Sequence, residues 1–390
     1  MLPGQPGTLG RAMVESEARG AAGQLGQRGH FSRGHESLGQ GHFQAVKADG
    51  QHSWTSHGCP PFVSVYQFER APQVRPGPCE AYCSTAMELS VVIGTYNRAH
   101  LLAGTLGALA AQQVPPSLDW EIVVVDNNST DATAQVVAAF SPKTAIPVRY
   151  VSEPRQGISH ARNRGIREAQ GSILAFTDDD VLPAPDWVSE VAAGMERWDA
   201  HGVGGRILPQ WEGERPGWLT ENRRPLRLLA LMESAESGWL AMPLKPHPQV
   251  WGANMAFRRE VFDRVGEFDP RRGVVGKRLF RGEESDLIER ALDLGLKIAY
   301  DPTLTVFHRI GPDRMRKAYF RRLEFESARG EARLKSVGRR RSFPAAPLRL
   351  YRAAAVDFAM WAGVALGQQP RVFDRELRWR ASFGALAGYW

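Results

Sequence analysis

The segment ILAFTDDD at residues 173–180 runs from a short apolar stretch directly into three consecutive aspartates. The apolar part has the length and composition of a buried β-strand. Three adjacent carboxylates repel one another unless a cation or solvent offsets their charge, and hard divalent cations prefer oxygen ligands of this kind. Because open α/β sheets bind ligands at the carboxyl ends of their strands, the segment predicts a ligand or metal site. The simpler interpretation is a group of acids that begins the next helix.

Strand and helix patterns alternate before this segment. Apolar runs predict buried strands at 89–93, 121–125, 148–151 and 173–177. Helical patterns separate them at 98–113, 132–140 and 159–170. Such a series predicts an α/β fold with a parallel sheet and right-handed crossovers. After the aspartates, weaker patterns predict helices at 186–198 and 283–294, and strands at 203–208, 250–257, 297–300 and 304–307.

The two ends of the chain differ in composition from the middle. Residues 1–86 are rich in Gly, Gln, His, Ser and Pro without periodicity, which is typical of a disordered low-complexity extension. Residues 309–390 carry 18 Lys and Arg against 7 Asp and Glu, a net charge of +11. Helical patterns at 314–335, 348–366 and 371–389 fall in this basic part. We therefore predict three regions: an extension at 1–86, an α/β domain at 87–310 and a basic helical segment at 311–390.

Cysteine usage and hydropathy exclude several classes of protein. All three cysteines precede Met87, so neither a disulfide framework nor a cysteine-based zinc site can hold the main domain. No stretch reaches the roughly 18 apolar residues of a membrane span, and no secretory signal pattern is visible. We therefore expect a cytoplasmic protein. The turn GTYNR at 94–98 contains neither a dinucleotide-binding glycine fingerprint nor a P-loop.

Several segments, taken in order, resemble family-2 glycosyltransferases. They are SVVIGTYNR (90–98), VVVDNNSTD (123–131), GISHARNRG (157–165), DDD (178–180) as the DXD site of that family, WGANM (251–255), GEFD (266–269) and GEESD (282–286). The resemblance implies a GT-A fold, in which a Rossmann-like nucleotide-binding half joins an acceptor-binding half in one mixed sheet. It also implies a metal-dependent, inverting hexosyl transfer from a UDP- or GDP-linked sugar to a glycan or glycolipid acceptor, in polysaccharide or cell-surface glycan biosynthesis.

The resemblance assigns roles to residues on the donor side. A divalent cation, Mn²⁺ or Mg²⁺, would be held by Asp178, Asp180 and His308. Such a cation would offset the charge that develops on the departing diphosphate. The residues expected to bind the nucleotide-sugar are Thr95, Tyr96, Asn97, Asp126, Arg162, Asn163 and Asp179. Some residues of both sets also have structural interpretations, such as helix capping for Asp126 and packing for His308.

The acids at the start of the predicted helix 283–294 are candidates for the general base that inversion requires. The family pattern there is Glu-Asp, whereas this chain has Glu283 followed by Glu284. Position favours Glu284, but Glu283 and Asp286 stay open, because residues three apart share a helix face and Glu284 is expected to point elsewhere. The alternative is a set of helix-terminal acids that complement the helix dipole. On the acceptor side we expect Trp251 and Asn254, although tryptophan is also a routine core residue.

The basic C-terminal segment predicts an anionic partner. We favour peripheral contact with the inner face of a membrane, with Trp361, Trp379 and Trp390 at the interface. A helical cap without membrane contact is the alternative, and nucleic acid fits poorly because no recognition motif accompanies the charge. Two other functions are weighed: a sugar nucleotidyltransferase, which should carry a Gly-rich basic loop after the first strand, and a non-catalytic sugar-nucleotide-binding relative, which would not need the whole acidic set.

Overall fold

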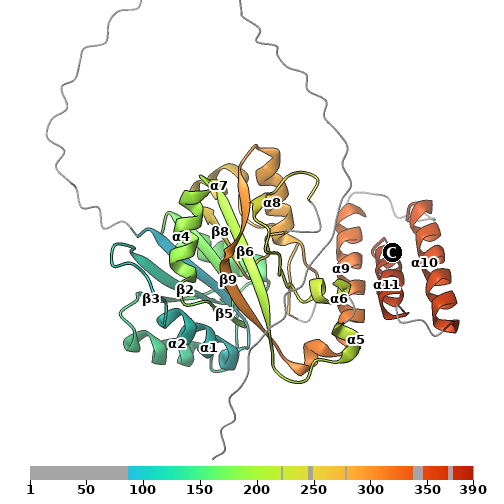
Figure 1. Cartoon of the computed structure of the whole chain (residues 1–390), viewed down its shortest axis with the longest axis horizontal. Helices are drawn as coiled ribbons and strands as arrows, with labels where there is room; N and C mark the ends of the chain where they lie inside the picture. The colour runs from blue at the N-terminus through green and yellow to red at the C-terminus, as the bar shows by residue number, and fades with distance from the viewer. Residues whose placement is uncertain are drawn as a thin grey trace, which may run out of the picture. The chain divides into compact units, whose positions relative to one another are not determined.

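One mixed β-sheet with helices on both faces forms the centre of the molecule (Figure 1). The computed structural model describes residues 87–220, 223–244, 249–276, 279–336, 346–367 and 372–389. The predicted extension at 1–86 and Trp390 lie outside these residues.

Nine strands of the described residues build the sheet in the order β3-β2-β1-β4-β8-β6-β9-β5, with β7 paired to β9. They are β1 (Leu89–Thr95), β2 (Trp120–Asp126), β3 (Val148–Ser152), β4 (Ile173–Asp178), β5 (Val181–Pro183), β6 (Gly202–Trp211), β7 (Gly238–Trp239), β8 (Met255–Arg258) and β9 (Ile298–Ile310). The first four are mutually parallel, which confirms the strand series predicted from the apolar runs. β8 is antiparallel to both β4 and β6, so the whole sheet is mixed, as the predicted fold class requires.

Alternate residues of the central strands supply two separate apolar layers. Val91 and Ile93 of β1 pack into one cluster, whereas Val92 packs into the other, because successive side chains of a strand point to opposite faces. The first cluster includes side chains of α1, α2 and α4, and the second includes side chains of α3, α7 and α8. These helices are α1 (Ala99–Ala110), α2 (Thr133–Phe140), α3 (Ile158–Glu168), α4 (Trp187–Arg197), α7 (Arg259–Val265) and α8 (Glu283–Asp293).

The second half of the sheet differs from its sequence-based prediction. β9 is one continuous strand over Ile298–Ile310, where two short strands were expected, and it pairs with β6 along both predicted pieces. His308 therefore lies within the strand rather than after it, opposite Val181 of β5. The strand expected at 250–257 begins only at Met255, so the preceding residues form a loop that carries Trp251. Short elements complete this half: α5 (Gly217–Thr220), α6 (Arg223–Leu228), and the 3₁₀ turns η1 (Ser141–Lys143) and η2 (Pro312–Met315).

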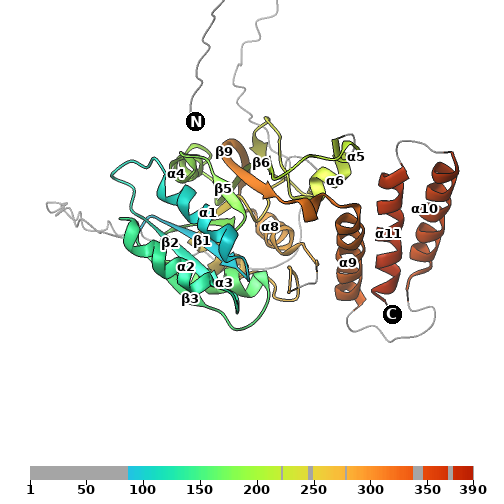
Figure 2. The same ribbon diagram turned by 90° about the horizontal axis from the view of Figure 1, so that it is seen from below.

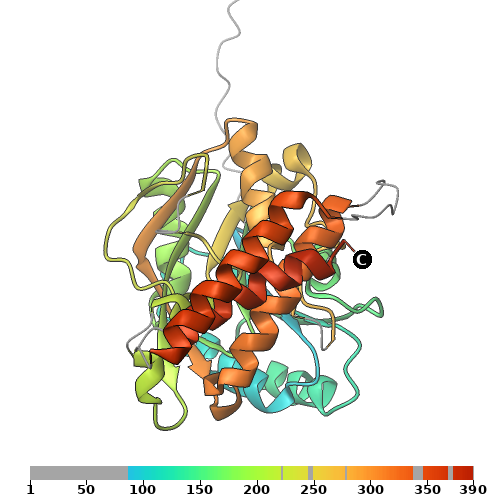
Figure 3. The same cartoon turned by 90° about the vertical axis from the view of Figure 1, so that its right-hand side faces the viewer.

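Three helices follow the sheet: α9 (Lys317–Ser336), α10 (Leu348–Leu366) and α11 (Val372–Ala387). α11 packs between α9 and α10 (Figure 2), and Figure 3 views the molecule from the side of these helices. Phe320 of α9 and Phe373 and Leu377 of α11 belong to the same apolar cluster as Val91 of β1. The C-terminal helices therefore contribute to the core that supports the sheet.

The tryptophans expected at a membrane interface face each other instead. Trp361 of α10 and Trp379 of α11 stack with ring centroids 5.6 Å apart and planes at 17°. Aromatic stacking of this kind holds the two helices together, so these rings are not a free interfacial pair. No helix in the described part of the chain has the length and apolarity that a membrane span requires.

Candidate functional site

A cavity of about 250 Å³ lies at the carboxyl ends of β1 and β4. These strands are neighbours in the sheet, with Gly94 opposite Asp178, so the turn after β1 and the aspartates after β4 meet at one edge. The start of α8 and the loop before β8 close the opposite wall. The predicted site residues that line the cavity are Thr95, Tyr96, Arg162, Asp178, Asp179, Asp180, Trp251, Glu283, Glu284 and His308.

The first two aspartates have different surroundings. The side chain of Asp178 is 35% exposed and lies 3.4 Å from the guanidinium of Arg162. Asp179 is buried and accepts hydrogen bonds from Thr95 Oγ1 at 2.8 Å and Arg98 Nη1 at 2.9 Å. Burial raises the pKa of Asp179 to about 6, although Arg98 opposes this shift. Asp178 is thus open to a ligand, whereas Asp179 is already engaged by the protein.

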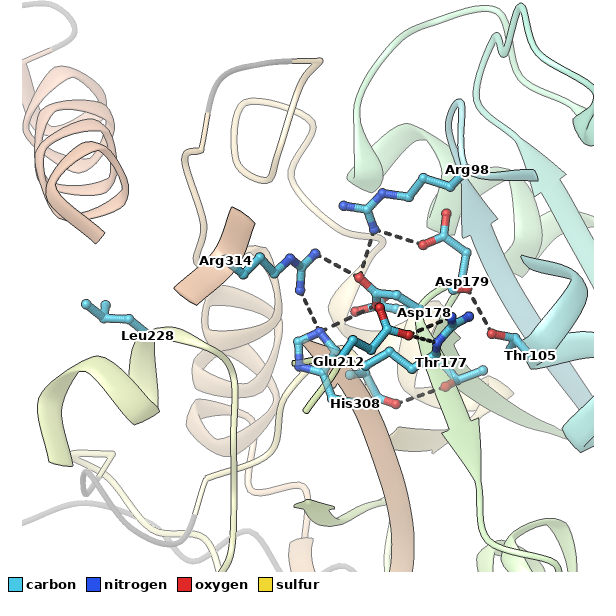
Figure 4. A network of polar contacts seen from close by, with 12 residues as sticks. Arg98, Thr105, Thr177, Asp178, Asp179, Glu212, Leu228, His308 and Arg314 are labelled. Atoms are coloured by element: carbon cyan, nitrogen blue, oxygen red, sulfur yellow. Dashed lines mark hydrogen bonds and ion pairs between the residues drawn. The ribbon is translucent and has the colours of Figure 1, made fainter. Parts of the chain in front are cut away.

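Asp180 is buried and contacts two arginines and a histidine, which are Arg98, Arg314 and His308. Figure 4 labels these three partners. The Oδ2 atom of Asp180 accepts hydrogen bonds from Arg98 at 3.0 Å and Arg314 at 2.8 Å, and its Oδ1 lies 3.6 Å from His308 Nε2. Burial alone would raise the pKa of Asp180, but the positive charges of Arg314 and Arg98 hold it well below its usual range. The repulsion expected within the triplet is therefore offset by guanidinium groups of the chain itself.

The second acidic group stands at the N-terminal end of α8. Glu283 and Glu284 are both buried, and Glu283 Oε1 accepts a hydrogen bond from Arg162 Nη1 at 2.9 Å. Burial and then the charge of Glu284 raise the pKa of Glu283 to about 8, against the opposing effect of Arg162. The Oε2 atoms of both glutamates are buried without a hydrogen-bond partner among the described residues. Because buried polar atoms are normally paired, these oxygens are suited to a ligand.

Asp286 occupies a different environment from the two glutamates. It forms ion pairs with Arg290 at 2.9 Å and Arg272 at 3.3 Å and does not line the cavity. Glu284 does line it. The predicted helix face that Asp286 shares with Glu283 therefore does not bring Asp286 into the cavity wall, because the two arginines hold its side chain elsewhere.

Two predicted asparagines are fully used within the fold and do not line the cavity. The side chain of Asn163 exchanges hydrogen bonds with the backbone of Phe268 at 2.8 and 3.0 Å. Asn254 accepts a hydrogen bond from Trp187 Nε1 at 2.8 Å and donates to the carbonyl oxygens of Arg206 and Leu304. Because these polar atoms are paired within the fold, the structure gives both residues positioning roles, and their contact with a ligand stays a prediction.

Two further predicted residues lie beside the cavity rather than in its wall. Asp126, which ends β2, accepts hydrogen bonds from the backbone of Ser129 at 2.8 Å and from Tyr150 Oη at 2.7 Å. Asn97 has a positive φ of 52° and accepts a hydrogen bond from Thr130 N at 2.7 Å. The contact of Asn97 with Thr130 joins the turns after β1 and β2, and Asp126 holds the start of the second turn, so both residues shape the end of the site that adjoins these turns.

Sequence reasoning gave no role to three arginines that line the cavity: Arg98, Arg281 and Arg314. Arg98 was visible in the quoted turn, next to Asn97, but its pairing with the aspartates spans more than 80 residues. Arg314 lies in a segment whose composition indicated only a basic tail. Gly252 was also missed, although a Cβ atom there would come within 2.1 Å of Arg162 Nη2. Long-range pairing of this kind leaves no local pattern in a sequence.

The donor atoms around Asp180 fit a divalent cation that arrives with part of its coordination shell. Asp178 and Asp180 offer carboxylate oxygens and His308 offers a ring nitrogen, which suit Mn²⁺ or Mg²⁺. His308 Nδ1 is buried without a partner among the described residues, while Nε2 lies toward Asp180. No three such side chains in the described part of the chain are grouped closely enough to hold an ion alone. Ions of this class complete their shell with water and substrate phosphates, so the residues fit a cation shared with a diphosphate.

Known proteins resemble this chain over the same region. Residues 90–266 match the family model described as Glycosyl transferase family 2. The chain is similar to a glucosyl-dolichyl phosphate glucuronosyltransferase of Haloferax volcanii, with 26% identity over 228 residues, 57% of this chain and 70% of that protein. It is 41% identical over 127 residues to a validoxylamine A glucosyltransferase of Streptomyces hygroscopicus subsp. limoneus, which covers 31% of this chain and only 28% of that protein.

A solved structure shares the fold. A mannosyltransferase from Pyrobaculum calidifontis in complex with GDP-Man and Mn²⁺ superimposes with a TM-score of 0.50 and 21% identity, over 77% of this chain and 86% of that one. At this level of identity the likeness concerns the fold alone. It confirms the predicted GT-A architecture of a mixed sheet with C-terminal helices following it.

Proposed function

We propose that the protein, whose residues 90–266 match the model of glycosyl transferase family 2, transfers a hexosyl group from a nucleotide-sugar to an acceptor hydroxyl with inversion. One observation carries the proposal: the aspartates after β4 and the glutamates that begin α8 line a single cavity. Two acidic groups facing one space can divide the work between the leaving diphosphate and the attacking hydroxyl. An acceptor in a glycan or glycolipid is favoured, since one similar protein is a glucosyl-dolichyl phosphate glucuronosyltransferase.

The donor is proposed to lie across the turn after β1. Thr95 and Tyr96 line this end of the cavity and Tyr96 is partly exposed, so its ring is free to contact a nucleoside. Arg98, Arg281 and Arg314 surround the adjoining space and can pair with a diphosphate, because guanidinium groups match phosphate oxygens in charge and geometry. A UDP- or GDP-linked sugar meets these requirements.

Asp178, Asp180 and His308 are the residues we propose to hold Mn²⁺ or Mg²⁺. The bound cation would offset negative charge on the departing diphosphate. Asp178 is the accessible member of the set, whereas Asp180 and His308 are buried.

Glu284 is the proposed general base. It lines the cavity, its Oε2 is unpaired among the described residues, and Asp286 is occupied by two arginines. Glu283 holds Arg162 in place and, with its raised pKa, keeps a proton near neutrality. Trp251 also lines the cavity, and its Nε1 is buried without a partner in the described part of the chain, which suits a hydrogen bond to an acceptor hydroxyl.

A panel of UDP- and GDP-sugars tests the donor assignment. Each compound is added with Mn²⁺, and the unfolding temperature and the release of nucleotide are measured. A ligand at about one hundred times its Kd stabilises the folded state by about 2.7 kcal/mol, so the correct donor should raise the unfolding temperature clearly. Turnover by the wild-type chain supports the enzyme. Binding without turnover, with any acceptor, would favour the non-catalytic alternative, and no shift with any nucleotide-sugar would contradict the proposal.

We also propose that α10 brings the enzyme to an anionic membrane surface on the cytoplasmic side. Leu348 and Leu366 at its two ends are 75% and 87% exposed, and Val356 and Met360 between them are also exposed. Arg349 near its start, in a segment of net charge +11, adds attraction to anionic lipid. A helix with exposed apolar side chains and basic neighbours suits shallow insertion rather than spanning.

Co-sedimentation with phosphatidylglycerol vesicles tests this contact. Changing both Leu348 and Leu366 to Glu should abolish binding, because it places acids on the proposed lipid face. Leu294→Glu is the matched control, since Leu294 is 52% exposed at the end of α8. Equal binding of the wild type and the double variant to phosphatidylglycerol vesicles would contradict the proposal. So would a wild-type protein that binds neutral phosphatidylcholine vesicles but not phosphatidylglycerol vesicles.

A further inference from the structure

Arg314 joins the two buried groups that we propose as metal ligands. Its Nη2 donates a hydrogen bond to Asp180 Oδ2 at 2.8 Å. Its Nη1 lies 2.6 Å from His308 Nε2, and both of these side chains are labelled in Figure 4. The side chain of Arg314 reaches Asp180 and His308 from η2, the short turn between β9 and α9, and is 23% exposed. One guanidinium therefore occupies the side of Asp180 and His308 that borders the cavity.

The contact with His308 is incompatible with metal coordination by the same atom. A guanidinium carries only donors, so Nε2 of His308 must accept, and the lone pair that a cation would need is used. The ring hydrogen then lies on Nδ1, which is buried without a partner among the described residues. Arg314 and a divalent cation would also repel each other if both sat against Asp180. The two cations are thus alternatives at one place.

Arg98 does not share this conflict. It binds Asp179 and Asp180 from the opposite turn and has no contact with His308 among those the structure gives. If Arg314 moves away, Asp180 keeps Arg98 as a guanidinium partner, so its buried negative charge stays paired. A rotation of the Arg314 side chain, without movement of the sheet, is enough to release both groups, because both of its contacts are made by the guanidinium end.

We infer that Arg314 is an internal competitor of the divalent cation: it pairs with Asp180 and occupies Nε2 of His308 before the donor arrives, and it must release both for a metal to bind. This inference rests on the metal role in the proposed function. Since Arg314 lines the same cavity, the released guanidinium is within the space where the diphosphate is proposed to lie. The consequence is cooperative loading, in which metal alone binds weakly and the nucleotide diphosphate, by attracting Arg314, makes room for it.

Direct titration of Mn²⁺ by calorimetry, without nucleotide and then with saturating UDP or GDP, tests the inference on the full chain. Arg314→Gln should bind Mn²⁺ alone more tightly than wild type, within the range of roughly 5- to 150-fold typical of coupled sites. The factor by which nucleotide increases the affinity for Mn²⁺ should decrease in Arg314→Gln by about the same fold as the affinity for Mn²⁺ alone increases. Arg309→Gln is the matched control, because Arg309 is an adjacent arginine whose side chain pairs with Glu212 outside the cavity wall.

Arg314→Lys provides a second variant, since it keeps the charge but cannot bridge Asp180 and His308 with a planar fork. Its Kd for Mn²⁺ should fall between those of wild type and Arg314→Gln. Equal Kd values for wild type and both Arg314 variants would overturn the inference and leave the metal role intact. If no protein binds Mn²⁺, even with nucleotide, the inference and the metal role fail together, whereas nucleotide binding and turnover without metal would still support a glycosyltransferase.

Discussion

The two acidic groups of the cavity are neutralised in different ways. Asp179 and Asp180 are balanced by Arg98 and Arg314. At the start of α8, Arg162 pairs with Glu283 and also lies 3.4 Å from Asp178, and the raised pKa of Glu283 leaves a proton on it near neutrality. In our proposal the first group exchanges one cation for another, and the second exchanges protons. This difference supports a division in which the aspartates serve the diphosphate and the glutamates serve the attacking hydroxyl.

Removing the base should produce the largest effect and test this division most directly. Glu284→Gln keeps the size of the side chain but cannot accept the proton, so kcat should fall by about 10²–10⁴-fold while nucleotide affinity stays unchanged. Steady-state kinetics and calorimetric nucleotide binding measure the two quantities. Asp286→Asn is the matched control because that carboxylate lies outside the cavity wall. A variant that loses nucleotide affinity instead of kcat would place Glu284 on the donor side.

Asp180→Asn should act on the other half of the division. We expect a 10- to 100-fold loss of Mn²⁺-dependent nucleotide affinity, the range found for weakened metal sites, because a neutral amide balances neither arginine nor cation. Asp313→Asn, a change at a side chain that is 88% exposed, is the control. Calorimetry with and without Mn²⁺ separates metal-dependent from metal-independent binding. Unchanged affinity under both conditions would mean that Asp180 has no part in holding the donor.

Gly252→Ala probes the arginine that connects the two acidic groups. The added Cβ would come within 2.1 Å of Arg162 Nη2, so the guanidinium must move from Asp178 and Glu283. Activity should fall by roughly tenfold, since small displacements at a catalytic site are costly. The unfolding temperature should fall as well, because Arg162 is buried and its displacement weakens its pairs with Asp178 and Glu283. Gly107→Ala, where a Cβ meets nothing within 4 Å, is the control. Full activity of the Gly252 variant would show that Arg162 need not stay between the two groups.

The proton on the glutamate pair predicts a smaller effect, on stability. The pKa of Glu283 rises from 4.5 to about 8 on folding, so between these values the folded state binds more protons than the unfolded state. The free energy of unfolding should therefore fall as pH rises from about 4.5 to 8, by at most about 1.4 kcal/mol per pH unit. Glu283→Gln should remove this component, and denaturant unfolding at several pH values measures it. Glu289→Gln, a change at an exposed residue of the same helix, should keep the wild-type dependence of the unfolding free energy on pH. The same dependence in the wild type, Glu283→Gln and Glu289→Gln would argue against a proton retained on Glu283.

The parallel half of the sheet could be predicted from local pattern, because its strands are buried on both faces and read as continuous apolar runs. The aspartates at the end of β4 stand out because they lie at a visible boundary between elements, whereas the acids at the start of α8 were predicted from the family resemblance. Arg314 and Gly252 could not be found in this way, since their importance comes from partners that are distant in the chain. Asn163 and Asn254 show that a conspicuous polar residue can be paired within the fold, which the sequence alone does not reveal.

Phe320, Phe373 and Leu377 have a practical consequence for anyone dividing this chain. They come from α9 and α11, yet they share an apolar cluster with the central strands, and Trp218 packs edge-on against both phenylalanine rings. A fragment cut after residue 310 would keep every proposed acid but expose the side of the body on which these rings sit. Truncation for expression or crystallisation should therefore retain the chain through α11, or aggregation of an uncovered apolar surface is the expected result.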